Sequence, residues 1–439
     1  MEDKRENSAS EVDELRSQNQ ALRVERERLE DPRRAAPHLA RVLLAPLWRG
    51  GYRLARRVGR ALFRRRRPDY HAEFRAYKAR SPQAVGASRP RVLHVTANFR
   101  TGGSTRLVVD LVEHLGSEYE QRAITQDYPS VRGYEGVALD EYPDLTSARP
   151  IGRLLERFRP DIVHIHYVAY QLLAMSDRDY RWYIHVFEAA EQSGARVIEN
   201  VNVPTAPYRS EAVDRYVYVS DYVKRRYARP GDRATVIYPG SDLARFRQAA
   251  EQDGSHDTVG LVYRLEPDKL DESSLDPIIE VLRRRADSRA LVVGGGMLLP
   301  GYQRAAAEAG IDGRVSFTGY VAYDDLPALY QQMTAFVAPV HTESFGHVSV
   351  LAMATELPVA GYNVGALEEM LGGSELLATP GDAQGLADIL VGLLDDPDKA
   401  HAIGVSNRRR AEENFTVERM IEGYRTLYEE LAGSARRSS

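Results

Sequence analysis

The sequence predicts an α/β protein with two Rossmann-like domains, each a doubly wound parallel sheet, preceded by an N-terminal helical extension. Short apolar segments alternate with amphipathic helical segments along most of the chain, which is typical of buried parallel strands joined by crossover helices. The alternation occurs in two series, one starting near residue 91 and the other near residue 257. A turn signal at 238–246 separates the two series.

Each series predicts a set of strands. In the first series they are expected at 91–99, 161–168, 195–203, 214–220 and 234–240. In the second series they are expected at 258–265, 290–296, 315–321, 335–340 and 357–363. We therefore place the first domain at 89–243 and the second at 244–415. The amphipathic segment 416–432 is expected to be the last helix.

Residues 1–88 form a separate extension. Leucines recur every seven residues within 10–30, at Leu15, Leu22 and Leu29. This spacing predicts a short coiled coil that could join two copies of the chain. Only Val12 is apolar among the companion seam positions Val12, Asn19 and Arg26. A solvated charged helix is the alternative, and we favour it.

A basic segment follows at 38–67. Twelve arginines and no lysine or carboxylate lie between Arg33 and Arg67, and apolar residues recur there at roughly helical spacing. A basic amphipathic helix of this kind can lie on an anionic membrane surface. Packing on the acidic remainder of the protein is the alternative, and we favour the membrane interpretation. Nucleic acid is not expected as a partner, because the main body is acidic.

Composition excludes several classes of protein. The chain has no cysteine, so disulfides, thiolate catalysis and cysteine metal sites are excluded. No apolar run approaches the roughly 18 residues that a membrane span needs. Residues 1–15 are acidic and lack the apolar core of a secretory signal. We expect a cytoplasmic protein, held at the inner face of the membrane if the basic segment binds there.

Ligands of open parallel sheets bind beyond the carboxyl ends of the strands, so candidate residues should follow strands. In the first domain, Gly102 and Gly103 precede a helix and would let backbone amides approach an anion. A tight turn that needs glycine is the alternative. His166 could face a cleft, although a hydrogen-bonded histidine inside the sheet is the commoner case.

In the second domain, Arg264 and Lys269 follow the first strand. Two cations at a strand end can clamp a diphosphate, whereas two solvated surface cations are the alternative. Glu343 stands between the strand 335–340 and a helical segment, and the amides of the residues after it would lie at that helix's N-terminus. This position favours a phosphate or a sugar hydroxyl. A helix-capping role for Glu343 is the alternative.

The order of these segments resembles the retaining GT-B glycosyltransferases, the large family that includes sucrose synthases and bacterial mannosyltransferases. In the second half the resemblance is carried by "GLVYRLEPDK", "LVVGGG", "VSFTGYV" and the continuous stretch 326–370. In the first half it is carried by "GGSTRLVVDLVEHL", "PDIVHIHYV", "DRYVYVSDYVKRRY" and "ATVIYPGSDLARF". The resemblance implies a GT-B architecture, with an acceptor domain, a nucleotide-sugar domain and a last helix that crosses back to the first domain.

The resemblance also implies roles for individual residues. Arg264 and Lys269 match the pair that holds the donor diphosphate, and Glu343 matches the first Glu of the Glu-x7-Glu element that touches the donor sugar. Phe345, Gly346 and Gly103 match backbone groups near the sugar, the phosphates and the reacting centre. We include Ser344 and His347 among the donor-binding candidates, and Asn202 and His166 among those on the acceptor and sugar side.

The sequence departs from the family pattern at three positions. The second Glu, which in the family holds the nucleotide ribose, is replaced by Leu351, which cannot accept a hydrogen bond. Asn202 stands where a histidine is common, and Tyr263 stands where a glycine often precedes the arginine. The resemblance therefore leaves ribose recognition and the identity of the donor open.

As a whole, the resemblance implies a hexosyltransferase-type enzyme that retains anomeric configuration. It would move a sugar from a nucleotide-sugar to a glycan or lipid-linked acceptor, in bacterial surface polysaccharide or glycolipid synthesis. No cofactor and no catalytic metal are expected. A catalytically degenerate, membrane-associated scaffold is the alternative. A dinucleotide-dependent oxidoreductase is disfavoured, because Pro300 breaks the helix that would follow "GGGMLLPG".

Overall fold

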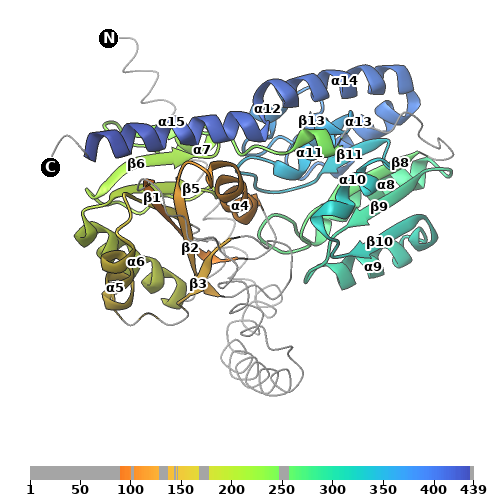
Figure 1. Cartoon of the computed structure of the whole chain (residues 1–439). Coiled ribbons are helices and arrows are strands. Elements are labelled where there is room, and N and C mark those ends of the chain that lie inside the picture. The colour runs from red at the N-terminus through yellow and green to blue at the C-terminus, as the bar shows by residue number, and fades with distance from the viewer. Residues whose placement is uncertain are drawn as a thin grey trace, which may run out of the picture. The chain divides into compact units, whose positions relative to one another are not determined.

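The computed structural model describes residues 89–99, 103–127, 137–142, 145, 147–167, 177–246 and 257–435 (Figure 1). All of them belong to one compact unit, Ala84–Ser439. The predicted coiled coil at 10–30 and the predicted basic helix at 38–67 lie outside the described residues.

The first domain is built on a seven-stranded sheet in the order β3-β2-β1-β4-β5-β6-β7, and every pairing within it is parallel. Its strands are β1 (Arg91–Asn98), β2 (Glu120–Asp127), β3 (Leu139–Glu141), β4 (Ile162–Tyr167), β5 (Arg196–Val201), β6 (Val213–Tyr218) and β7 (Ala234–Val236). Its helices are α4 (Gly103–Leu115), α5 (Arg149–Phe158), α6 (Asp177–Ser193) and α7 (Asp221–Tyr227). The strand order reverses between β1 and β4, which is where ligands of such sheets bind.

The second domain repeats this plan with a six-stranded parallel sheet in the order β10-β9-β8-β11-β12-β13. Its strands are β8 (Thr258–Val262), β9 (Arg289–Val293), β10 (Val315–Gly319), β11 (Ala335–Ala338), β12 (Val359–Tyr362) and β13 (Leu377–Ala378). Its helices are α8 (Asp276–Arg284), α9 (Leu299–Glu308), α10 (Leu326–Tyr330), α11 (His347–Ala354), α12 (Leu367–Leu371), α13 (Ala383–Asp395) and α14 (Pro397–Asn414). Short 3-10 turns are η1 (Leu243–Phe246), η2 (Glu272–Leu275), η3 (Asp312–Arg314) and η4 (Tyr323–Asp325).

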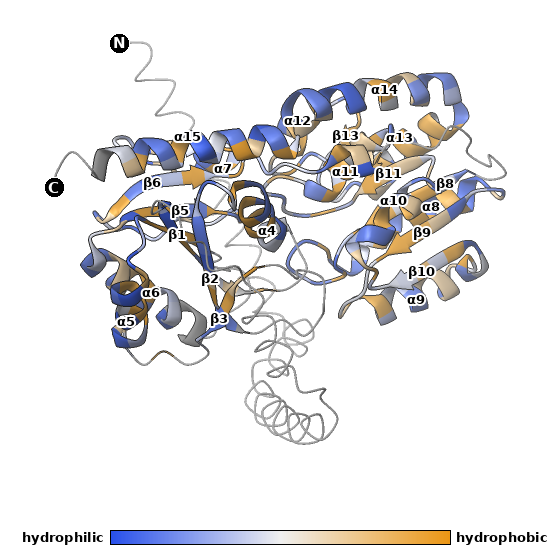
Figure 2. Cartoon of the chain, viewed as in Figure 1, coloured by the Kyte–Doolittle hydropathy of each residue, from blue (hydrophilic) through white to orange (hydrophobic). Residues whose placement is uncertain are grey.

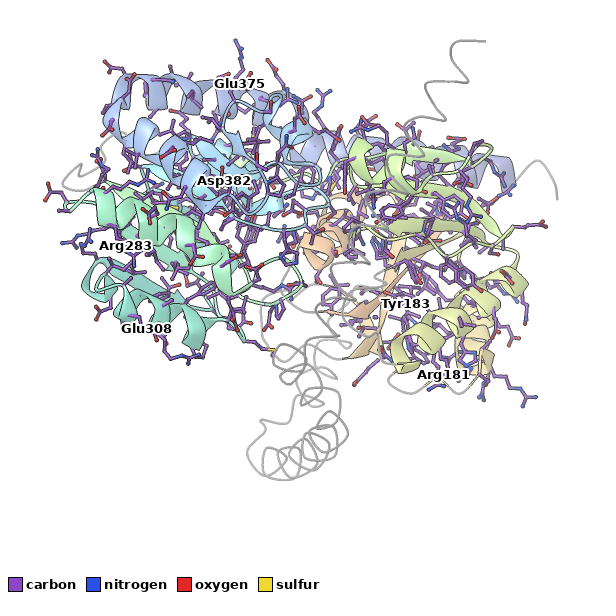
Figure 3. The ribbon with its side chains drawn as sticks, turned by 180° about the vertical axis from the view of Figure 1, so that it is seen from behind. Arg181, Tyr183, Arg283, Glu308, Glu375 and Asp382 are labelled. Carbon is purple, nitrogen blue, oxygen red and sulfur yellow. The ribbon has the colours of Figure 1, made fainter. Side chains whose placement is uncertain are left out.

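The central strands are buried on both faces, which explains why apolar residues predominate in them. Every residue of β4 and of β11 is buried, and Figure 2 shows the hydrophobic colouring concentrated on strands and on the inner sides of helices. Helices, by contrast, have one buried side and one exposed side. On α6, Tyr183 is fully buried, whereas Arg181 is exposed to solvent (Figure 3). The predicted fold class, two doubly wound parallel sheets, is confirmed.

The last helix, α15 (Val417–Ala435), packs on the first domain although it follows the second domain in sequence. It contacts α4, β4 and β5. Its buried residues recur every three or four positions: Val417, Met420, Ile421, Tyr424, Leu427, Tyr428 and Leu431. The chain enters and leaves the second domain at adjacent points, because Ser241 and Thr416 form a parallel bridge.

Among the described residues, no helix is long and apolar enough to cross a membrane.

Candidate functional site

Glu343 and Lys269 form the centre of the candidate site. The Glu343 side chain is 1% exposed, and Lys269 Nζ lies 2.6 Å from its Oε1 and 2.9 Å from its Oε2. The backbone N–H groups of Ser344 and Phe345 also donate to Oε1, at 3.0 and 3.3 Å. A buried carboxylate needs a charged partner and hydrogen bonds, and Glu343 has both. The ammonium group of Lys269 is thereby fixed beside the 343–346 loop.

Arg264 follows β8 on the same loop as Lys269 but pairs with a different carboxylate. Its Nη2 donates to Asp268 Oδ2 at 2.6 Å, and its side chain is 46% exposed. The two cations that the sequence predicted as a pair therefore follow the same strand end, one anchored in the interior and one on the surface. Asp268 was not anticipated as a partner.

Gly346 sets the direction in which α11 starts. Its φ is +101°, in the left-handed region, and a Cβ there would lie 2.9 Å from Met370 Cε. The backbone conformation favours glycine, whereas the flexible end of Met370 could move aside. No side chain caps the start of α11. The first N–H groups of a helix have no intrahelical acceptor and attract negative charge, so this end of α11 suits an anion.

His347, the first residue of α11, meets the first domain. A Cβ on Gly103, at the start of α4, would lie 3.8 Å from His347 Cβ. Both ring nitrogens of His347 are buried, and neither has a hydrogen-bond partner among the described residues. Burial lowers the pKa of His347 to about 4, and the positive charges of Lys269 and Arg106 add to this effect. A neutral imidazole with two unused nitrogens therefore lies between the starts of two helices.

Arg106, which the sequence analysis did not single out, brings a third cation to this region. It pairs with Asp110 one turn along α4 and with Glu113 at 3.1 Å. Its guanidinium also lies 5.6 Å from the ring centroid of Tyr323 in the second domain, a cation–π contact. The Arg106–Asp110 spacing is visible in the sequence, but it predicts only an ordinary pair on a helix surface.

Ser344 is turned towards the first domain. Its hydroxyl donates to the carbonyl oxygen of Asn202 at 3.0 Å, and its own carbonyl accepts a hydrogen bond from the Ser220 hydroxyl at 2.6 Å. The side chain of Asn202 accepts a hydrogen bond from Asn200 Nδ2 at 2.6 Å. Asn202 therefore lies at the contact between the domains, next to the 343–346 loop.

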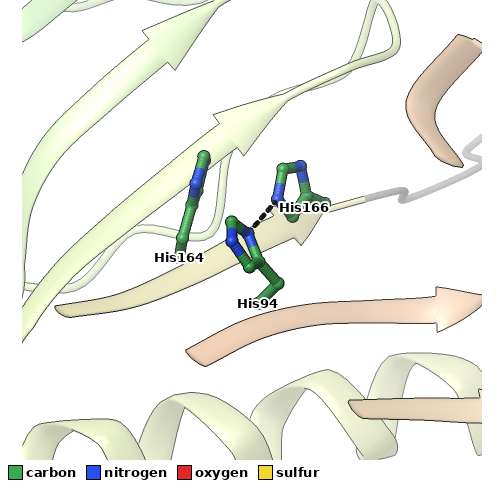
Figure 4. A group of neighbouring side chains, drawn as sticks. All are labelled: His94, His164 and His166. Atoms are coloured by element: carbon green, nitrogen blue, oxygen red, sulfur yellow. Dashed lines mark hydrogen bonds between the residues drawn. The ribbon is translucent and has the colours of Figure 1, made fainter. Parts of the chain in front are cut away.

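His166 belongs to a buried cluster with His94 and His164, all three fully buried (Figure 4). His94 Nδ1 lies 3.3 Å from His166 Nε2, and His94 Nε2 lies 2.9 Å from Gln121 Oε1. Gln121 Nε2 donates to the carbonyl of Leu111, which fixes Oε1 as the acceptor. His94 Nε2 therefore carries the proton, and its Nδ1 accepts from His166 Nε2–H.

Hydrogen bonds connect this part of the sheet to α15. His164 Nδ1 lies 2.7 Å from the hydroxyl of Tyr428, and the hydroxyl of Tyr424 donates to Asn200 Oδ1 at 2.5 Å. Burial lowers the pKa of His94 to about 4, and it lowers the pKa values of His164 and His166 well below the usual value. His94 and His166 thus form a hydrogen-bonded pair of neutral rings, and the ring of His164 lies 4.1 Å from that of His166 and bonds Tyr428 of the last helix.

Two groups in the described part of the chain have spacing that could hold a metal ion. One is this histidine cluster, and the other is Asp110, Glu113 and His114 on α4. In the first group the hydrogen-bond chain already uses both ring nitrogens of His94 and of His164. In the second, the two carboxylates pair with Arg106, and His114 Nδ1 bonds the carbonyl of Asp110.

Leu351 and Tyr263, the two unusual residues of the second domain, both lie inside it. Leu351 is 1% exposed and lies one turn after His347 on α11. Tyr263 is buried where β8 ends, and burial together with the negative charge of Glu343 raises the pKa of its hydroxyl. The phenol of Tyr263 thus stands close to the buried carboxylate.

Comparison with family models matches residues 101–245 to "Glycosyltransferase Family 4" and residues 257–396 to "Glycosyl transferases group 1". A relative from Mycobacterium tuberculosis, a GDP-mannose-dependent alpha-(1-6)-phosphatidylinositol monomannoside mannosyltransferase, is 34% identical over 220 residues, which cover 45% of this chain and 57% of the relative. A D-inositol 3-phosphate glycosyltransferase from Rhodococcus opacus is 29% identical over 67% of this chain and 74% of its own length.

Solved structures share the fold at low sequence identity. Sucrose-phosphate synthase from Thermosynechococcus elongatus superposes with a TM-score of 0.66 at 17% identity, covering 79% of this chain and 100% of that chain. The Anabaena protein HepE, solved with UDP and glucose, gives a TM-score of 0.64 at 16% identity, covering 77% and 99%.

Proposed function

The chain belongs to the group 1 glycosyltransferases of the GT-B fold, and from this premise we propose that it transfers a sugar from a nucleoside-diphosphate sugar to an acceptor hydroxyl. The observation that carries the proposal is the Lys269–Glu343 pair beside the uncapped start of α11. The loop after β8 supplies a fixed cation, and the neighbouring start of α11 supplies backbone N–H groups. These are the groups that a departing diphosphate needs.

The proposed chemistry is electrostatic. As the bond between the anomeric carbon and the diphosphate breaks, negative charge grows on the phosphate oxygens. Lys269, Arg264 and the N–H groups at the start of α11 stabilise that charge, and they are in place before the reaction begins. Glu343 holds Lys269 and accepts hydrogen bonds from sugar hydroxyls. The departing phosphate takes the proton of the acceptor, the configuration is retained, and no metal takes part.

The names of the relatives support a bacterial glycolipid or polysaccharide acceptor. The mycobacterial relative is named for GDP-mannose and a phosphatidylinositol mannoside, and HepE was solved with UDP and glucose. We propose a glycan or lipid-linked acceptor bound by the first domain, with Asn202 beside it. We also propose that the basic segment 38–67 brings the enzyme to the inner membrane surface, and that 10–30 is the segment through which copies would associate.

The test is a panel of UDP-, GDP- and ADP-sugars, with release of nucleoside diphosphate followed by mass spectrometry and binding of UDP and GDP measured by calorimetry. Lys269→Ala should reduce turnover by about 10²- to 10³-fold, as for loss of one oxyanion-stabilising donor. Lys399→Ala, at an exposed lysine of α14, is the matched control and should have no effect. If the protein neither binds a nucleoside diphosphate nor releases one from any donor, the proposal is wrong, and the scaffold alternative gains support.

A further inference from the structure

The carboxylate of Glu369 in α12 reaches from the second domain to the first. Its Oε1 accepts the backbone N–H of Asp221 at 2.8 Å, and its Oε2 accepts that of Tyr222 at 2.7 Å. The hydroxyl of Tyr238 donates to Oε1 at 2.8 Å. One side chain of the second domain thus receives three hydrogen bonds from residues that precede that domain, and none of the proposed chemistry uses it.

These bonds complete the start of α7. The first N–H groups of a helix have no acceptor within the helix. Ser220 Oγ accepts the N–H of Val223 at 3.2 Å, and regular helical bonding begins with the N–H of Lys224 to the carbonyl of Ser220. The remaining two N–H groups, those of Asp221 and Tyr222, depend on Glu369. In this structure the acceptors of those two N–H groups therefore come from the second domain.

The helix that carries Glu369 is also attached to the 343–346 loop. The N–H of Ala366 donates to the carbonyl of Glu343 at 3.1 Å, and Met370 and Leu367 lie against Gly346. Behind α12, Arg410 of α14 donates to the carbonyl of Glu369 at 2.8 Å. The position of α12 is thus tied to the loop at two points.

A second contact joins the start of α7 directly to the 343–346 loop. The Ser220 hydroxyl, directly before α7, donates to the carbonyl of Ser344 in the same loop at 2.6 Å. The start of α7 is therefore bonded both to the loop itself and, through Glu369, to the helix that supports the loop. A shift of one domain against the other has to break these bonds together.

We propose that Glu369 is a positioning residue for sugar transfer, which fixes the 343–346 loop relative to the first domain. Its catalytic consequence rests on the proposed function, in which the donor occupies the second domain and the acceptor the first. Loss of the Glu369 carboxylate leaves Lys269, Arg264 and Glu343 in place, so donor affinity is retained. The alignment of donor and acceptor is lost, and the rate of transfer falls because misplacement of reacting groups by about 1 Å costs up to about 100-fold.

The kinetic test compares Glu369→Ala and Glu369→Gln with Glu368→Ala, a matched control at the adjacent exposed position. For Glu369→Ala we expect kcat to fall by about 10- to 100-fold, with Kd values for UDP and GDP within about two-fold of wild type. Glu369→Gln keeps one acceptor oxygen, so its kcat should lie between those of Glu369→Ala and wild type. Unchanged kcat in Glu369→Ala, or an equal loss of nucleotide affinity, would overturn the proposal.

The structural test measures the distance between the domains directly. Because the chain has no cysteine, Arg181→Cys on α6 and Glu308→Cys on α9 can carry spin labels at two unique exposed sites, one in each domain (Figure 3). Pulsed electron paramagnetic resonance should give a broader distribution of distances between the two spin labels in the Glu369→Ala background than in the otherwise wild-type protein. An identical distribution overturns the proposal.

The two tests fail separately from the proposed function. If wild type turns over no nucleotide-sugar, the proposed function is wrong, while the distance measurement still decides the role of Glu369. If Glu369→Ala does not fold, Ser220→Ala and Tyr238→Phe each remove one of the same cross-domain bonds. Each should then broaden the distribution, and unchanged distributions in both would overturn the proposal.

Discussion

Replacement of Lys269 by methionine should reduce stability as well as turnover, because Glu343 is left buried without its cation. Removal of one partner of a buried pair costs about 3–5 kcal/mol. Lys269 is 34% exposed and Glu343 keeps two backbone N–H donors, so we reduce this to about 2–3 kcal/mol. For a domain of this size, that loss lowers Tm by about 5–10 °C.

Two controls separate this cause from a general loss of packing. The double variant Lys269→Met with Glu343→Gln removes the uncompensated charge and should recover most of the lost stability. Arg264→Ala breaks a surface pair with Asp268, worth at most about 1 kcal/mol, so its Tm should stay close to wild type although its turnover falls.

The assay is thermal unfolding followed by circular dichroism, with turnover measured on the same samples. A Tm for Lys269→Met equal to that of Arg264→Ala, or a double variant no more stable than Lys269→Met, would refute the reasoning. Either result would mean that Glu343 does not depend on Lys269 for charge compensation.

Three further predictions address other parts of the chain. Gly346→Ala should cost about 1–3 kcal/mol, because it strains a left-handed backbone against Met370; equal denaturant midpoints would contradict this. The pKa of His347 is lowered to about 4 in the folded protein, whereas in the unfolded chain it has the ordinary value near 6.5. The neutral ring therefore costs no stability above pH 6.5, and the free energy of unfolding falls as the pH drops from 6.5 towards 4. His347→Gln should therefore lose less stability than wild type between pH 7 and 4.5, measured by urea unfolding, and parallel losses would count against it. Deletion of 38–67 should abolish flotation with liposomes that contain anionic lipid, and flotation equal to that of the full chain would remove the membrane proposal.

Strands that are buried along their whole length, such as β4 and β11, were among those that the sequence predicted. β11 is apolar throughout because both sides of the sheet are covered, and β4 is apolar except for His164 and His166. β2 was not predicted, because its sequence, EQRAITQD, is polar. The structure explains the polarity, since Gln121 bonds His94 and the carbonyl of Leu111. A buried strand whose polar groups are satisfied by distant partners shows no apolar pattern.

Some features of the candidate site could likewise be predicted from the sequence, and others could not. Glu343 and Lys269 could be expected near one another because both follow strands of one parallel sheet, and their ion pair agrees with that expectation. The roles of Arg106 and Glu369 could not be predicted from local patterns, because their informative contacts lie in the other domain. Glu369 is 148 residues from Asp221. Its position in a short acidic segment gives no sign of that contact.

The return of α15 to the first domain has a consequence for how the protein is made. Tyr428 bonds His164 in the middle of the first sheet, and its neighbours on α15 cover Leu107 and Leu111 of α4. During synthesis, the first domain therefore cannot be completed until the second domain and α15 have been made. The apolar surface that α15 covers stays exposed until that helix emerges, and truncation within α15 would damage the first domain.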